Sequence, residues 1–366
     1  MPEPIIFGPL PPPYGGVSTF MSSLASGAPE HGVRVWSYAG KPGSGDAGIE
    51  YVNHRRLGHL RLLFKDGRGA RITDSTHFHL EYPNPLLLPA WLIARSLLDF
   101  RWIKVLHDGS LPARFEKFGF HDRRLFHLAI RAVDEVVAVD DVLKGWLVES
   151  LGYRGKVHVI PASLPQPPEW STAVTDTDTV RVLERSDAHT RRVCSLGIFI
   201  PAYGFHHVVE AVERLRRETQ EDIGLMLIDG GFAGDHRYRE DILRGRDWIT
   251  VAKEVPHPQI GQIYKSSDVL VRATEHESIG LCRIEAICAG IPVIATDVGE
   301  TRGMLTYRYG DIDALCVHLR SVLEGGSKAD TKHWADIFES EARKNRSRYW
   351  QVITGQAEHE IPDQKI

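Results

Sequence analysis

Few cysteines, no excess of positive charge and no long apolar run are the first features of this 366-residue sequence. Its four cysteines form no C-x-x-C pair, which excludes a disulfide framework and a cysteine zinc site, and predicts buried free thiols in a reducing compartment. Lys and Arg number 44 against 48 Asp and Glu, so the formal net charge of −4 argues against nucleic acid as the main partner.

Membrane-crossing and targeting segments are also missing from the pattern. The longest apolar stretch, residues 86–98, is interrupted by Pro89 and Arg95 and is too short to span a bilayer. The first residues lack the charged and apolar regions of a signal peptide. We therefore expect a cytoplasmic protein that is soluble or peripheral at the inner face of the membrane.

What the sequence does have is an alternation of short β-branched runs with helix-period segments. A length of 366 residues suggests two domains. Strands are expected at residues 5–8, 33–38, 76–80, 102–106, 135–139 and 156–160, and then at 192–196, 224–228, 248–252, 268–272 and 292–296. Such alternation predicts two α/β domains with parallel sheets, which bind ligands at the carboxyl ends of their strands.

A polar, proline-containing stretch separates the two series of strands and predicts a linker. The expected organisation is an N-terminal domain over 1–165, a linker over 166–189 and a C-terminal domain over 190–332. Residues 333–354 have the pattern of a helix that packs across both domains, and residues 355–366 are a tail.

Two adjacent glycines, Gly15 and Gly16, follow the first strand and precede a helical pattern. Paired glycines allow close approach of a ligand, and a helix N-terminus offers free N–H groups to phosphate oxygens. A Pro/Gly surface turn is an equal alternative. The loop is neither G-x-G-x-x-G nor a P-loop, which disfavours a dinucleotide cofactor or a kinase-type site.

A pair of carboxylates, Glu277 and Glu285, follows the strand at 268–272. Glu277 is expected in a loop at the carboxyl end of that strand. Glu285 shares the inward stripe of the next helix with Leu281 and Cys288. A buried carboxylate needs hydrogen-bond donors, which the hydroxyl pair of a ribose or sugar would supply. The alternative is that Glu285 pairs with an arginine and that Glu277 is a loop charge.

The ordered set of motifs resembles family 4 of the retaining glycosyltransferases. Glu277-x7-Glu285 with Gly280-Leu281 between is followed by Ala289-Gly290-Ile-Pro-Val-Ile-Ala-Thr-Asp-Val-Gly299. The resemblance extends to Gly15-Gly16-Val-Ser and to Val136-Val-Ala-Val, Val159-Ile-Pro161 and Leu196-Gly197…Tyr203-Gly204. It implies the GT-B architecture, meaning two Rossmann-like domains whose parallel sheets face across a cleft.

The resemblance also implies roles for individual residues. Glu285 would hold the ribose of a nucleotide-sugar donor, and Glu277 would contact the hydroxyls of the donor sugar. The backbone N–H groups of Ser278, Ile279, Gly280 and Leu281 would face the sugar and phosphates, with Gly15 and Gly16 near the distal phosphate. His107 matches the active-site histidine of the family. No metal is implied, and the pairs His77/His79 and His206/His207 are expected to be structural.

One departure from the family concerns the cations that contact the diphosphate. The family has an Arg and a Lys at the positions of Ile198 and Tyr203. Since the departing diphosphate develops negative charge, other groups must supply the positive charge that stabilises it. Arg272 is the expected replacement, ahead of Arg283 and Arg302, and the Tyr203 hydroxyl is expected to add one weaker, neutral hydrogen bond to the donor. The alternative is that Arg272 is an ordinary ion-paired arginine.

A basic and apolar segment in the first domain suggests an anionic partner. Leu57, Leu60 and Phe64 could form one face of a helix whose cations are Arg55, Arg56, Arg61 and Lys65. Such a helix suits an anionic membrane surface or a lipid-linked acceptor, and a solvated helix face is the alternative.

The combined reading is a retaining glycosyltransferase that moves a sugar from a nucleotide-diphospho-sugar to a hydroxyl acceptor. The acceptor is expected to be a glycan or glycolipid of cell-surface polysaccharide synthesis. The donor is a substrate, and no cofactor or metal is expected. The alternatives are a sugar-nucleotide epimerase of the same fold and a non-catalytic nucleotide- or glycan-binding protein, which the missing cations favour.

Overall fold

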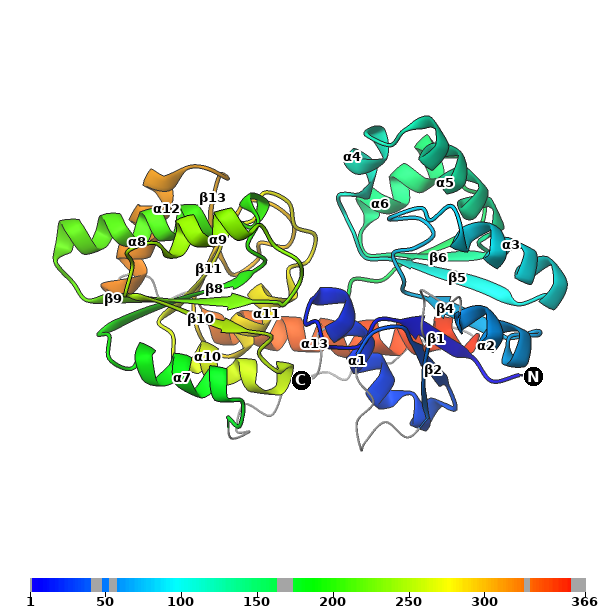
Figure 1. Ribbon diagram of the computed structural model, residues 1–366, viewed down its shortest axis with the longest axis horizontal. Helices are drawn as coiled ribbons and strands as arrows, with labels where there is room; N and C mark the ends of the chain where they lie inside the picture. Colours follow the sequence, from blue (N-terminus) through cyan, green and yellow to red (C-terminus); the bar gives the residue numbers. More distant parts are fainter. Residues whose placement is uncertain (1, 41–47, 53–57, 163–173, 326–329, 357–366) are drawn as a thin grey trace. The chain divides into compact units, whose positions relative to one another are not determined.

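A computed structural model describes residues 2–40, 48–52, 58–162, 174–325 and 330–356 (Figure 1). The chain divides into two compact units, each built on its own sheet. The first unit comprises Met1–Pro12, Val17–Ser163 and Glu341–Ile366, and the second comprises Pro13–Gly16 and Leu164–Ser340.

The first unit contains a seven-stranded parallel sheet in the order β3-β2-β1-β4-β5-β6-β7. Its strands are β1 (Ile5–Gly8), β2 (Arg34–Ser37), β3 (Ile49–Tyr51), β4 (Arg71–Asp74), β5 (Arg101–Leu106), β6 (Glu135–Ala138) and β7 (Lys156–Val159). Its helices are α1 (Gly16–Gly27), α2 (Gly58–Asp66), α3 (Leu87–Leu98), α4 (Leu111–Glu116), α5 (Phe120–Ala132) and α6 (Asp141–Gly145).

The second unit contains a six-stranded parallel sheet in the order β10-β9-β8-β11-β12-β13. Its strands are β8 (Arg191–Gly197), β9 (Ile223–Asp229), β10 (Ile249–Lys253), β11 (Val269–Arg272), β12 (Val293–Thr296) and β13 (Leu305–Tyr307). Its helices are α7 (Thr177–Ser186), α8 (Phe205–Thr219), α9 (His236–Leu243), α10 (Ile260–Lys265), α11 (Leu281–Cys288) and α12 (Ile312–Leu323).

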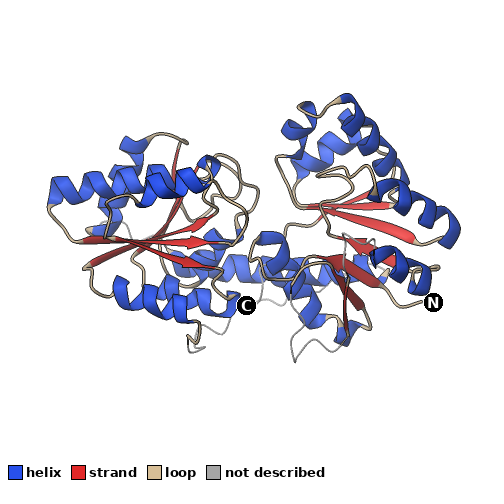
Figure 2. Ribbon diagram, in the orientation of Figure 1, coloured by secondary structure: helices blue, strands red, loops and turns tan. Residues whose placement is uncertain are grey.

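Each sheet is covered by helices on both faces, which explains why its central strands are largely buried (Figure 2). In the second unit α8 and α12 lie on one face of the sheet, and α7 and α10 lie on the other (Figure 1). All residues of β1, β6, β9, β11 and β12 are buried. The predicted fold class, two Rossmann-like α/β domains with parallel sheets, is therefore confirmed.

The last helix, α13 (Thr331–Thr354), contains residues of both units. Trp334 packs on Gly303 of the second unit, where an added Cβ would lie 2.5 Å from the indole. Tyr349 is fully buried in the core of the first unit, and its hydroxyl donates to the Ile160 carbonyl at 2.9 Å. The helix expected at 333–354 is present.

Two local predictions are wrong. Residues 76–80, expected to be a strand, form a loop, and the strand is β4 just before them. The backbone turns there because the Asp74 carboxylate accepts the Thr76 N–H at 2.8 Å. Within the expected linker, residues 177–186 form α7, whose N-cap Asp176 accepts from the Thr179 N–H at 2.8 Å. Residues 166–173 of that linker and 357–366 of the tail lie outside the described residues.

Candidate functional site

The loop between β11 and α11 places Glu277 beside Arg272 at the carboxyl end of β11. The Arg272 Nε and Nη2 groups both donate to Glu277 Oε2, at 3.0 and 2.7 Å. A third N–H, on Nη1, reaches the Leu196 carbonyl of the neighbouring strand β8. Arg272 is 8% exposed, so the pair is held inside the unit rather than in solvent. This arrangement leaves Glu277 Oε1 without a donor among the described residues.

Gly280 ends the loop in a left-handed conformation, with φ of 63°, directly before α11. A side chain there would be strained and would lie 3.1 Å from the Glu277 side chain. No described residue accepts a hydrogen bond from the N–H groups of Ser278, Ile279, Gly280 and Leu281. These N–H groups at the start of α11 can therefore bind anionic or hydroxyl oxygens.

Glu285 lies one turn further along α11 and is 6% exposed, as its position on the apolar stripe predicted. His257 Nε2 lies 2.8 Å from Glu285 Oε1, and the Tyr264 hydroxyl donates to Oε2 at 3.2 Å. Burial alone would lower the pKa of His257, but the Glu285 carboxylate outweighs burial and raises it. Each carboxylate oxygen has a second lone-pair site, so both can still accept a hydroxyl.

Arg283 is buried in the scaffold of this loop and does not supply a free cation. It is 0% exposed, and its guanidinium donates to the Val298 carbonyl at 2.7 Å and to Thr274 Oγ1 at 3.0 Å. The prediction of Arg283 as a secondary diphosphate cation is wrong, because these bonds hold it between β11 and β12. Arg302 pairs with Glu300 at 2.7 Å.

Tyr203, which stands in place of a cation, lies with its ring against Arg272. The Arg272 guanidinium lies 4.9 Å from the centre of the Tyr203 ring. The next residue, Gly204, has a φ of 67°, and a Cβ there would lie 1.9 Å from the Ala273 carbonyl oxygen. This close approach of the β8–α8 turn to the end of β11 explains why glycine stands at position 204.

Gly15 and Gly16 lie in the segment Pro13–Gly16, which clusters with the second unit. A Cβ on Gly15 would lie 2.8 Å from the Phe232 ring, whereas one on Gly16 would meet nothing within 4 Å. Gly15 is therefore required by packing, and Gly16 leaves open space at the start of α1. The phosphate role of both glycines stays a prediction.

His107 follows β5 in the first unit and contacts protein on several sides. Its backbone N–H donates to Glu81 Oε1 at 3.0 Å, and its ring lies 4.9 Å from that of Phe20. Its Nε2 is buried without a hydrogen-bonding partner among the described residues. Burial holds the pKa of His107 well below its usual range, so the imidazole is neutral. Its predicted catalytic role is untested by this geometry.

A buried polar network lies next to His107 at the carboxyl ends of β4 and β5, and the sequence did not predict it. Asp74 is 0% exposed, and its Oδ1 lies 3.3 Å from Lys104 Nζ. Its Oδ2 lies 2.8 Å from His79 Nδ1 and accepts from Trp102 Nε1 at 3.1 Å. Burial alone would raise the pKa of Asp74, but Lys104 and His79 hold it well below its usual range. His79 is buried within this network.

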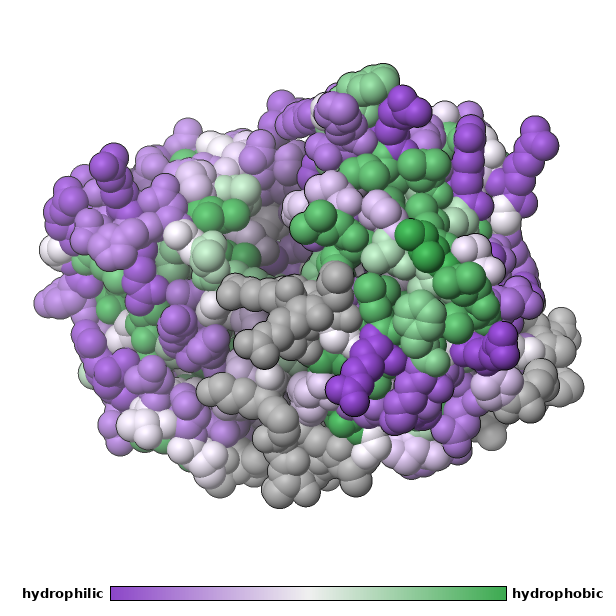
Figure 3. Space-filling model, turned by 45° about the vertical axis from the view of Figure 1, so that its right-hand side comes forward, coloured by the Kyte–Doolittle hydropathy of each residue, from purple (hydrophilic) through white to green (hydrophobic). Residues whose placement is uncertain are grey.

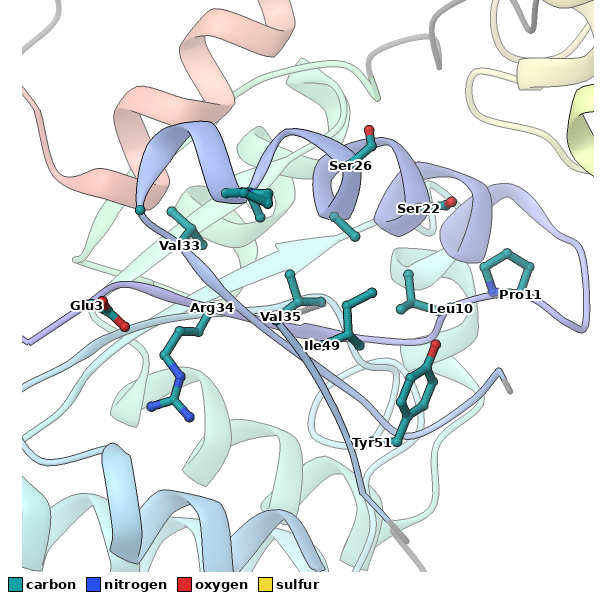
Figure 4. A pocket seen from close by; sticks show the side chains of 15 residues that line it. Glu3, Leu10, Pro11, Ser22, Ser26, Val33, Arg34, Val35, Ile49 and Tyr51 are labelled. Carbon is teal, nitrogen blue, oxygen red and sulfur yellow. The ribbon is translucent and has the colours of Figure 1, made fainter. Parts of the chain in front are cut away.

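A pocket of about 570 Å³ in the first unit lies along α1 (Figure 4). Ser22 and Ser26 of α1 line it on one side, and Val35 and Ile49 of the sheet line it on the other. The guanidinium of Arg34 at its rim is paired with Glu50 and Asp66. None of the predicted site residues lines this pocket.

The predicted basic helix is present in part, as α2. Arg61, Phe64 and Lys65 are exposed on it, whereas Arg55 and Arg56 lie outside the described residues.

No helix in the described ranges is long and apolar enough to cross a bilayer. In the same ranges no three His, Cys, Asp or Glu side chains gather as metal ligands, and metal independence stays a prediction.

Comparisons with known proteins match the region that contains this site. Residues 176–326 match the family model of the glycosyl transferases group 1. A lipopolysaccharide core biosynthesis glycosyltransferase, LpsE of Rhizobium meliloti, is 24% identical over 77% of this chain and 76% of its own. Mannosylfructose-phosphate synthase of Agrobacterium fabrum is 24% identical over 56% of this chain. The chain spans about half, 48%, of that synthase.

The solved structures resemble the whole chain in fold. HepE of Anabaena, solved with UDP and glucose, has a TM-score of 0.67 at 16% identity, over 96% of this chain and 97% of its own. An identity this low supports the architecture and not the activity. Residues 176–326 therefore match the glycosyl transferases group 1 model, within a chain that has the GT-B fold.

Proposed function

We propose that this chain is a retaining glycosyltransferase that uses a nucleoside-diphospho-sugar donor and a hydroxyl acceptor. One observation carries the proposal. Among the described residues, Glu277 Oε1 and the N–H groups of residues 278–281 have no hydrogen-bonding partner at the start of α11, and the buried Glu285 lies within this helix. This set of groups suits sugar hydroxyls, phosphate oxygens and a ribose, in the order in which a nucleotide sugar presents them.

The chemistry is positioning and electrostatic stabilisation. The bond from the sugar C1 to the diphosphate breaks, the acceptor oxygen bonds to C1 on the same face, and the acceptor proton passes to the departing diphosphate. The N–H groups at the start of α11 stabilise the charge on the phosphates. Glu277 orients the sugar while positive charge develops at C1. The acceptor is a glycan or a lipid-linked glycan.

Thermal stabilisation by a panel of nucleotide sugars tests the donor class, because a ligand of the native state raises stability by mass action. UDP-glucose, GDP-mannose and ADP-glucose are suitable members, with the free sugars as controls. A rise in melting temperature with one nucleotide series and release of its diphosphate in the presence of acceptors support the proposal. Absence of both contradicts it.

Glu285→Gln is expected to weaken binding of the preferred nucleoside diphosphate by roughly 1.5–3 kcal/mol, the range for a hydrogen bond to a charged group. The amide keeps the size of the side chain and loses the charge that two ribose hydroxyls would share. Calorimetric titration measures the change. Glu184→Gln, which changes an exposed carboxylate of α7, is the control and should bind normally. Normal affinity in a folded Glu285→Gln protein would remove the ribose role.

A non-catalytic nucleotide-binding protein is the second candidate, because Ile198 and Tyr203 carry no charge and Arg272 is engaged by Glu277. The two candidates differ in turnover. A binder would be stabilised by nucleotide sugars and would release no diphosphate with any acceptor.

We also propose that the first unit binds an anionic membrane surface. Exposed Arg61 and Lys65 flank Phe64 on α2, and Ile93 and Leu97 are exposed on α3, which contacts α2. Figure 3 brings forward the side that carries these helices and shows apolar side chains gathered there.

Vesicle binding tests the membrane proposal. Each cation near an anionic surface contributes about 1 kcal/mol, so Arg61→Gln with Lys65→Gln should weaken binding to phosphatidylglycerol vesicles about 30-fold. Arg181→Gln with Arg244→Gln, which removes two exposed cations of the second unit, should leave binding unchanged. Equal binding of the unmutated protein to phosphatidylglycerol and phosphatidylcholine vesicles, or none to either, contradicts the proposal.

A further inference from the structure

The loop that follows β4 contains a histidine–carboxylate pair to which neither the motifs nor the comparisons assign a role. His77 Nδ1 is hydrogen-bonded to Glu81 Oε2. The Glu81 side chain is 1% exposed, whereas that of His77 is 31% exposed. One end of the imidazole is thus anchored inside the unit, and the other end reaches solvent.

Glu81 is fixed from two further directions. Its Oε1 accepts the His107 N–H at 3.0 Å, which ties it to the carboxyl end of β5. Its carbonyl accepts from Arg114 Nη2 at 2.9 Å, which ties it to α4. A buried carboxylate with a partner on each oxygen, on a residue whose carbonyl is also hydrogen-bonded, is a rigid anchor. An ionised Glu81 carboxylate can only accept hydrogen bonds, so the proton of a neutral imidazole facing it must be on His77 Nδ1.

A proton on Nδ1 leaves the lone pair of His77 on Nε2. No described residue donates to His77 Nε2. Burial, followed by the Lys104 ammonium, lowers the pKa of His77 to about 4, so the ring stays neutral near pH 7. A neutral imidazole with Nδ1–H fixed on a carboxylate presents Nε2 as a hydrogen-bond acceptor, and a hydroxyl group is its natural donor.

The surroundings favour a sugar as the source of that hydroxyl. Tyr82 is 59% exposed, and its ring centre lies 6.1 Å from that of His77. Arg114 lies 4.3 Å from the centre of the Tyr82 ring and also pairs with Asp108 at 2.6 Å. An exposed aromatic ring beside charged hydrogen-bonding groups suits a ligand that has both hydroxyls and an apolar face.

The position in the fold assigns this hydroxyl to the acceptor. His77 follows β4 and His107 follows β5, so both stand at the carboxyl edge of the first sheet, where parallel α/β sheets bind ligands. The groups proposed for the donor lie in the second unit. We propose that His77 Nε2 accepts a hydrogen bond from the attacking hydroxyl of a sugar acceptor, and that Glu81 is the positioning residue that sets its tautomer. This inference rests on the proposed transferase function.

Two substitutions at position 77 separate hydroxyl binding from a structural role. In His77→Asn the amide N–H₂ can replace Nδ1–H toward Glu81, but nothing replaces Nε2. In His77→Gln the longer side chain places an amide near the position of Nε2 and gives up the contact with Glu81. If His77 binds the acceptor, His77→Asn should lower kcat/KM for the acceptor about 10- to 100-fold, and His77→Gln should recover part of that loss. If His77 has only a structural role through Glu81, His77→Asn should instead keep a higher kcat/KM than His77→Gln.

The assay uses the nucleotide sugar that stabilises the protein most as donor, and octyl glucoside, octyl galactoside and octyl mannoside as acceptor probes. The KM of the donor should change less than twofold in both variants. Glu81→Gln should resemble His77→Asn. His189→Gln breaks a histidine–carboxylate pair of the second unit, with His189 Nδ1 2.8 Å from Asp222 Oδ1, and should keep normal kinetics. Normal acceptor kinetics in His77→Asn overturn the inference.

A spectroscopic measurement tests the pair without turnover. An NMR experiment that correlates the two ring nitrogens with the carbon-bound ring protons distinguishes the tautomers of a neutral imidazole. We expect the Nδ1–H tautomer for His77, and a change toward Nε2–H in Glu81→Gln. An Nε2–H tautomer in the unmutated protein overturns the inference even if transfer occurs. An unmutated protein with the expected tautomer that transfers to no acceptor contradicts the proposed function instead, and the acceptor role with it.

Discussion

Glu277→Gln is expected to lower turnover at least ~100-fold and to leave the affinity for the nucleoside diphosphate unchanged. Arg272 uses two N–H groups on Glu277 Oε2, so Oε1 remains for a hydroxyl of the donor sugar. A contact to the reacting sugar strengthens as charge develops at C1, whereas the nucleotide is bound by other groups. Initial rates of diphosphate release and calorimetric titration with the diphosphate measure the two effects separately.

Arg272 should matter to the same step, because it holds the carboxylate of Glu277. Arg272→Ala leaves Glu277 without its donors and should reduce turnover by a similar factor. Arg272→Lys should recover only part, because an ammonium cannot donate through the two sites of a guanidinium. Tyr203→Phe keeps the ring that packs on Arg272 and is the matched control, with near-normal turnover expected.

The effect of Arg272→Ala on diphosphate affinity tests the role as a replacement cation. A loss of affinity tenfold or more would mean that Arg272 also contacts phosphate. Unchanged affinity with lost turnover would limit Arg272 to positioning Glu277. Normal turnover in both Glu277→Gln and Arg272→Ala would contradict the assignment of this loop to the donor sugar.

Asp74→Ala should be the most destabilising single change in the first unit. It would leave the ammonium of Lys104, which is 0% exposed, with the Thr76 carbonyl as its one partner among the described residues. Breaking a buried ion pair in this way costs about 3–5 kcal/mol. It would also remove the acceptor of His79 Nδ1 and Trp102 Nε1. Hydrogen exchange of the β4 and β5 amides measures the loss in this unit without assuming two-state unfolding of the whole chain.

A double-mutant cycle identifies the cause. Asp74→Asn with Lys104→Met should be less destabilising than the sum of the single changes, because no charge is left buried alone. Lys65→Gln serves as the control, since Lys65 is 62% exposed and lies 3.9 Å from Glu50, and such pairs contribute little. Additive effects of Asp74→Asn and Lys104→Met would show that the two charges do not stabilise each other.

Local sequence patterns were sufficient to predict those features of the structure that depend on neighbouring residues in the chain. Apolar runs bounded by polar segments predicted most of the buried strands, and a three- and four-residue spacing placed Glu285 on the buried side of α11. The pattern failed at residues 76–80, where Thr-His-Phe-His-Leu alternates like a strand. It also failed at α7, whose polar composition resembles a linker although Asp176 caps a helix there.

The sequence by itself determined that the chain has two parallel α/β sheets, and that a loop carboxylate and a helix carboxylate follow the strand at 268–272. Only the tertiary structure decided what these groups touch. His257 and Tyr264 reach Glu285 from 28 and 21 residues away. Lys104 reaches Asp74 from 30 residues away. The Glu81 carboxylate accepts the N–H of His107. The physical reason is that periodicity records which side of an element is buried. The partner of a buried polar group depends instead on strand order, register and loop path, which form only when the whole sheet packs.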